Sequence, residues 1–214
     1  ESARKLAANV RLEQIEQFPT IEFFKTVPLL TLTQFGKWSE IVAEPAPPEK
    51  LDYSNAIWRY ARGIAYANMG DIDRAKSEQA KLAAVKDTVQ IRFLDTADYP
   101  ASVLLNIADD LLQGEIAIKS GDPLMAAQHF QRAVDKQDAL PYTEPPFWYY
   151  PTRQSLGQAL MEAEEFENAE AVYRRDLKDY PRNGWSMSGL AVALERQGKS
   201  KEAAEIRKLL EIVW

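Results

Sequence analysis

The residues that could support catalysis or bind a metal are few in this chain. His129 is the only histidine, and cysteine is absent. A Ser-His-Asp triad would need this same histidine, and no G-x-S-x-G sequence surrounds a serine nucleophile. A metal site needs several converging nitrogen, oxygen or sulfur ligands, of which one histidine supplies one. We therefore expect His129 to be a packed or surface side chain, and we expect no catalytic, cofactor-binding or metal site.

The acidic residues do not suggest acid–base catalysis either. Asp109 and Asp110 are adjacent, so in a helix their side chains point about 100° apart and do not converge on one substrate. The phosphate-binding patterns G-x-x-x-x-G-K and G-x-G-x-x-G are absent. A run of carboxylates is typical of a solvated helix face. It consists of Glu162, Glu164, Glu165, Glu167 and Glu170. These observations predict a protein that is not an enzyme.

Composition limits the remaining classes of function. Of the 214 residues, 46% are hydrophobic and 27% are charged, which is typical of a globular chain. The net charge of −6 argues against a nucleic acid partner, because phosphate recognition needs a basic surface. The sequence has no run of 18 or more apolar residues, so it predicts no membrane span. The composition does not decide the cellular compartment.

The segments that must position any functional side chains are repeated. Leu156-Gly157 is followed at fixed distances by Ala169, Tyr173 and Pro181, within two amphipathic segments joined by a short turn. The same glycine recurs as Gly63 and Gly114, and the same alanine as Ala75, Ala126 and Ala203. Repeat units therefore start near residues 22, 56, 107, 150 and 184. Two adjacent pairs of starts are separated by 34 residues.

This spacing resembles the tetratricopeptide (TPR) repeat, and the resemblance covers nearly the whole chain. It implies an all-α fold, a TPR-like right-handed superhelix of antiparallel helix pairs, with one solenoid over residues 1–214. Residues 144–151, 153–157 and 183–185 are similar to a group of bacterial TPR proteins. That similarity implies a bacterial origin and further TPR-like helices upstream, and it brings no catalytic residues.

Several segments depart from the repeat. Residues 1–17 have apolar residues at helical spacing and read as a partial repeat, one helix whose partner is missing. We therefore expect the chain to be the C-terminal part of a longer protein. Insertions interrupt the repeats at 90–106 and 141–149. Within the first insertion, 90–99 read as a loop with room for one helical turn, and Pro100 opens a long helix over about 101–120.

Arg62 is unusual, because the place just before Gly63 normally holds a packed leucine in this repeat. An arginine there is either buried in an ion pair or directed into a binding pocket. For the ion pair, the expected carboxylate is Asp109, Asp110 or Glu115. The sequence leaves both alternatives open.

The second insertion is rich in proline and aromatic residues. Prolines stiffen such a segment, and aromatic side chains beside a groove are common anchors for a partner. Alternatively, the rings fold back and fill the gap between two imperfectly stacked repeats. The aromatic residues are Tyr142, Phe147, Trp148, Tyr149 and Tyr150.

The concave surface is the expected binding surface, lined by the first helix of each unit. The fifth and ninth places of these helices are mainly apolar or amide, whereas TPR domains that grip acidic C-terminal tails use basic residues there. We therefore predict a protein or peptide partner that binds through a peptide segment or a helix. An acidic C-terminal tail is disfavoured as that partner. The predicted partner-binding residues are Tyr60, Arg62, Leu111, Glu115, Trp148, Tyr149, Gln154, Gln158 and Trp185.

Two further hypotheses concern assembly. The chain could be a structural or assembly portion of a larger protein whose ligand, metal or catalytic site lies upstream. The C-terminal residues are also strongly apolar, so they either pack back on the preceding helix or contact another subunit. These residues are Leu209, Leu210, Ile212, Val213 and Trp214. Self-association into a homo-oligomer through the apolar chain ends is therefore a hypothesis.

Overall fold

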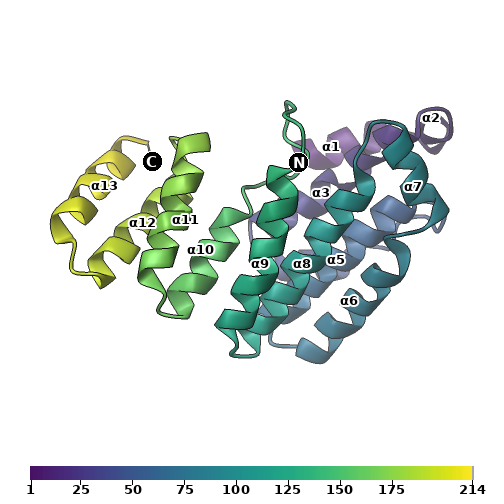
Figure 1. Ribbon diagram of the computed structural model, residues 1–214. Helices are drawn as coiled ribbons and strands as arrows, with labels where there is room; N and C mark the ends of the chain where they lie inside the picture. The colour runs from purple at the N-terminus through teal and green to yellow at the C-terminus, as the bar shows by residue number, and fades with distance from the viewer. Residues whose placement is uncertain (214) are drawn as a thin grey trace.

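The computed structural model describes residues 1–213, and this part of the chain contains thirteen α-helices, one 3-10 helix and no strand. Figure 1 shows the helices as antiparallel neighbours in an elongated stack, with α1–α7 at one end and α12 and α13 at the other. The predicted all-α fold, built from helix pairs, is confirmed.

The N-terminal region contains α1 (Ser2–Asn9), α2 (Leu12–Gln17), the 3-10 helix η1 (Pro19–Glu22), α3 (Phe23–Gln34) and α4 (Trp38–Ala43). The predicted single helix over 1–17 is wrong, because Val10 and Arg11 have extended backbone angles. The break places Val10 and Ile15 in one buried cluster with Leu51. Gln14 Oε1 accepts a hydrogen bond from the Arg11 N–H at 2.8 Å, which stabilises the start of α2.

The central region contains α5 (Asp52–Asn68), α6 (Ile72–Val85), α7 (Val89–Thr96), α8 (Ala101–Lys119) and α9 (Pro123–Asp138). The interpretation of residues 90–99 as a loop is wrong, since α7 occupies most of them. Thr88 caps this helix by accepting from the Ile91 N–H, and Ile91 and Leu94, three residues apart, are both buried on one face. The long helix expected after Pro100 is present as α8.

The C-terminal region contains α10 (Arg153–Glu162), α11 (Phe166–Asp179), α12 (Gly184–Arg196) and α13 (Ser200–Val213). Residues 141–152 connect α9 to α10 without a helix, and we call this segment the strap. The unit expected to start near 150 therefore has its first helix from Arg153. Tyr150 and Pro151 belong to the strap.

Close helix packing explains the glycine that recurs at the eighth place of the units, as Gly63, Gly114 and Gly157. A Cβ on Gly63 would lie 2.5 Å from Leu112 Cδ2, and a Cβ on Gly114 would clash with the Phe130 ring. Each side chain occupies the space that the glycine leaves. The largest buried cluster consequently runs without interruption from α5 to α10, and a smaller one surrounds Tyr173 in the last two helix pairs.

Candidate functional site

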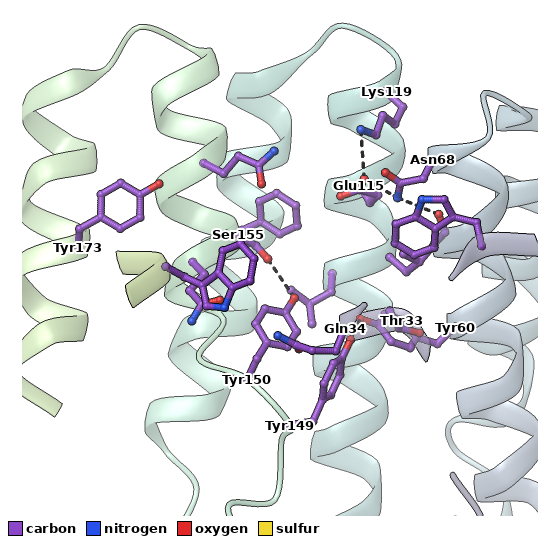
Figure 2. Close-up of a pocket in the computed structure, with 17 residues that line it drawn as sticks. Thr33, Gln34, Tyr60, Asn68, Glu115, Lys119, Tyr149, Tyr150, Ser155 and Tyr173 are labelled. Atoms are coloured by element: carbon purple, nitrogen blue, oxygen red, sulfur yellow. Dashed lines mark hydrogen bonds and ion pairs between the residues drawn. The ribbon is translucent and has the colours of Figure 1, made fainter. Parts of the chain in front are cut away.

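The predicted partner-binding residues largely come together in one cavity of about 410 Å³. Seven of the nine line it, contributed by α5, α8, α10, α12 and the strap. Figure 2 shows labelled side chains from α5, α8, α10 and the strap directed into this cavity. The seven are Tyr60, Leu111, Glu115, Tyr149, Gln154, Gln158 and Trp185.

A second, larger cavity of about 1030 Å³ adjoins the first. The two share lining residues, namely Gln34, Tyr149, Tyr150, Gln154 and Trp185. Apolar side chains of α3 and the strap form much of the larger cavity, and the turn between α11 and α12 completes it. We call the two cavities together the groove. Its size and mixed aromatic and polar lining suit a bound ligand or peptide segment.

The strap forms one wall of the groove. Trp148 is 2% exposed and packs edge-on against Tyr60, with ring centroids 5.6 Å apart. Trp148 lines the larger cavity, and most of its ring is buried in the gap between repeats. Tyr149, in contrast, lines both cavities and shares a hydrogen bond of 3.0 Å with Tyr60 through their hydroxyl groups. The strap thus both fills the gap between repeats and lines the groove.

Hydrogen bonds fasten the strap to α9 and α10. Gln137 Oε1 accepts from both the backbone N–H and the hydroxyl of Thr152, at 2.7 and 2.8 Å. Gln137 Nε2 donates to the Tyr150 carbonyl at 3.0 Å, and the Tyr150 hydroxyl lies 3.0 Å from Ser155 Oγ. Burial raises the pKa of Tyr149 and of Tyr150, so both rings present neutral hydroxyl groups. The wall is therefore formed before any ligand binds.

Arg62 lies outside the groove. Its guanidinium donates to the Val42 carbonyl at 2.8 Å and to the Tyr66 hydroxyl at 2.7 Å, and its Nε lies 3.5 Å from Glu78 Oε1. It also lies 4.6 Å above the Trp58 ring. The prediction that Asp109, Asp110 or Glu115 pairs with Arg62 is wrong, because these carboxylates contact other residues. These contacts agree with the ion-paired alternative, because the arginine is engaged by α4, α5 and α6.

Asp109 and Asp110 diverge as predicted. Asp109 accepts from Lys86 Nζ at 2.8 Å, and Asp110 accepts from Lys136 Nζ at 2.7 Å, so the two carboxylates face opposite neighbouring helices. His129 lies beside Asp110, with 3.9 Å between Nδ1 and Oδ1, and burial together with the charge of Arg132 lowers its pKa. Within residues 1–213, no three side chains of His, Cys, Asp or Glu gather where they could hold a metal ion.

Glu115 has a different environment from these paired carboxylates. It lies in the groove with 23% of its side chain exposed, and its Oε1 accepts from Asn68 Nδ2 at 2.8 Å. Lys119 Nζ lies 3.6 Å from the same oxygen, beyond an ordinary hydrogen bond. Burial raises the pKa of Glu115, although Lys119 and Asn68 act against the rise. Figure 2 shows the three side chains together at one end of the cavity.

Asn68 and Lys119 were not among the predicted site residues, yet both line the groove. Each lies four residues after a ninth place, at Ile64 and Glu115, and so on the same face of its helix. Extending the row of fifth and ninth places by one helical turn would have identified both residues. Trp38 and Tyr150 also line the cavity, but their positions depend on how distant segments pack.

At the end of α13, Leu209 and Ile212 are exposed, while Ile206 packs against the C-terminal cluster. Trp214 lies outside the described residues. No helix within residues 1–213 is both long and apolar enough to cross a bilayer.

Comparison with known proteins identifies the repeats. Residues 155–212, which include most of α10 and the helices that follow, match the sequence model of the tetratricopeptide repeat. No curated protein and no solved structure matches the chain. The matched segment contains the units in which the spacing of glycine, alanine and aromatic residues is most regular. The C-terminal part of the chain, residues 155–212, therefore consists of tetratricopeptide repeats.

Proposed function

We propose that this protein is a non-enzymatic interaction scaffold, which binds a peptide segment or helix of another protein in the groove. The observation that carries the proposal is the convergence of side chains from several repeat units on one open cavity. TPR repeats generally mediate protein–protein interaction, and the first helices of a solenoid line its binding surface.

The character of the groove supports a peptide rather than a reaction. Gln154 and Gln158 supply amide groups for backbone hydrogen bonds, and Tyr149 and Trp185 supply aromatic surface. Hydrogen bonds already hold the strap in place, so little ordering entropy is lost when a partner binds. An extended or helical segment with apolar side chains fits these features.

The test is selection of peptides from a random linear library displayed against the full chain. Affinities of the selected peptides are then measured by fluorescence anisotropy for Trp185→Ala and Phe18→Ala. Both residues are exposed aromatics, at 57% and 63%, but Phe18 does not line the groove. Because aromatic anchors dominate such interfaces, Trp185→Ala should weaken binding by about tenfold or more. Phe18→Ala should leave binding unchanged.

Equal binding by the two variants would exclude the groove as the binding site. Failure to select any peptide that depends on Trp185 would also contradict the proposal. Thermal unfolding of each variant should confirm that the fold is retained, which we expect because both side chains are largely exposed.

A further inference from the structure

Three described carboxyl groups have a pKa raised by burial, namely Glu22, Glu115 and Asp176. Glu22 accepts from the Ser54 N–H at 2.7 Å and lines a separate cavity near α2 and α7. Asp176 is fully buried beneath Ser186 and Asn183. Neither lines the groove, so Glu115 is the one of the three that a bound partner could contact.

One basic and one acidic side chain act on Glu115. Lys119 is the nearest cation, at 3.6 Å, and the carboxylate of Glu162 also acts on Glu115 and opposes its ionisation. Glu162 is exposed at the end of α10 and accepts from Gln158 Nε2 at 3.1 Å. Two acidic groups and one basic group therefore act together at this end of the groove. An acidic ligand would be repelled there, and a basic one attracted.

Aromatic rings continue from this charged end along the groove. Trp38, Tyr60, Tyr149, Tyr150 and Trp185 all line the same cavity as Glu115. Burial raises the pKa of Tyr60 and of Tyr149, and the charge of Glu115 adds a smaller contribution in the same direction. Rings near a carboxylate suit arginine and lysine, whose aliphatic stems pack on aromatic faces while the cation pairs with the acid.

We propose that the groove selects a partner segment with an arginine or lysine side chain, which forms an ion pair with Glu115, while neighbouring apolar residues of that segment pack on the strap. This inference rests on the proposed function. It adds the chemical class of the partner, a basic and apolar peptide segment.

The test repeats the library selection in parallel on the full wild-type chain and on Glu115→Gln. The variant keeps the size of the side chain and an oxygen that can accept from Asn68. Glu167→Gln, an exposed change on α11 outside the groove, is the matched control. Peptides selected on the wild type should share a basic residue at a fixed position. Binding of these peptides should fall about tenfold in Glu115→Gln and should not change in Glu167→Gln.

Replacing the shared basic residue of the peptide by glutamine completes a double-mutant cycle. The replacement should weaken binding to the wild-type chain and have little effect on Glu115→Gln, which would show that the two groups contact each other. Peptides that depend on Trp185 but carry no basic residue would overturn this inference and leave the proposed function intact. Absence of any peptide that depends on Trp185 would overturn both.

Discussion

Glu78, Asp109 and Asp110 lie where helices pack against one another, whereas Glu115 lies on the groove. Each of the first three is buried and has a cationic nitrogen within 3 Å, from Arg59, Lys86 and Lys136 respectively. Glu115 has one neutral amide donor at 2.8 Å and its nearest ammonium at 3.6 Å. These three carboxylates between packed helices, the seam carboxylates, are thus neutralised by a close cation, whereas Glu115 on the groove is less completely neutralised.

This difference separates two uses of a buried charge. A paired carboxylate between helices fixes how the helices stack, because removal of either partner leaves the other charge buried. An incompletely paired carboxylate in an open cavity costs folding free energy until a ligand supplies the missing charge. Proteins often accept such a cost at binding sites. Glu115 and the seam carboxylates should therefore respond to the same substitution in opposite directions.

The largest effect is expected for Glu78→Gln. This change leaves the guanidinium groups of Arg59 and Arg62 without their shared carboxylate between α5 and α6. We expect a loss of about 2–3 kcal/mol in the free energy of unfolding, measured by urea denaturation at pH 7. The exposed Glu167→Gln should change it by no more than about 0.5 kcal/mol. A similarly small loss for Glu78→Gln would mean that the seams do not depend on paired charge.

A smaller effect of the opposite sign is expected for Glu115→Gln. Replacing a desolvated carboxylate by an amide of the same shape should raise the free energy of unfolding by about 0.5–1 kcal/mol at pH 7. Urea denaturation of the two chains measures this gain. A loss as large as that of Glu78→Gln would instead identify Glu115 as a structural residue, and its contrast with the seams would disappear.

The pH dependence of this gain follows from the raised pKa of Glu115. A raised pKa means that Glu115 holds its proton more readily in the folded chain than in the unfolded chain, where its pKa has the ordinary value of 4.5. The contribution of protonated Glu115 to the free energy of unfolding is fully present below the unfolded pKa. It is lost as pH rises through the pKa of the folded chain. The advantage of Glu115→Gln should therefore be small at about pH 4 and reach its full size near neutral pH.

The groove residues could be predicted because their spacing is local. Leu111 and Glu115, or Gln154 and Gln158, are four residues apart on a first helix, so they share one face whatever the rest of the chain does. Glycine and alanine at fixed places located the helix pairs for the same reason. Secondary structure at the N-terminus was harder, since the break at Val10 depends on packing against the distant Leu51.

Long-range contacts also determine the parts of the candidate site that could not be predicted. Arg62 finds its carboxylate in Glu78 of α6, sixteen positions along the chain, and local spacing does not indicate which acidic residue faces it. Trp148 is buried because the strap folds back across Tyr60. A proline- and aromatic-rich segment predicts that some rings will be buried and some will line a groove, but it does not assign each ring.

The smallest effect is expected at Glu164, which lies away from the groove. It tests whether a residue that lowers the free energy of unfolding there also affects binding, as Glu115 is expected to do. Glu164 has a φ of +61°, at the place in the turn where the other units have Gly70, Gly121 and Gly198. A side chain in this conformation costs about 1 kcal/mol, partly offset because glycine gives the unfolded chain more freedom. Its ion pair with Arg196, 3.4 Å long and exposed, should contribute little.

Glu164→Gly should therefore raise the free energy of unfolding by about 0.5 kcal/mol, and Gly121→Ala should lower it by about 1 kcal/mol. Urea denaturation measures both, and anisotropy with the library-selected peptides should show unchanged affinity in Glu164→Gly. Glu115→Gln is expected to gain stability and lose binding, so the pair separates a residue kept for a ligand from one that only strains a turn. Weaker peptide binding by Glu164→Gly would extend the binding surface beyond the groove to the turn between α10 and α11.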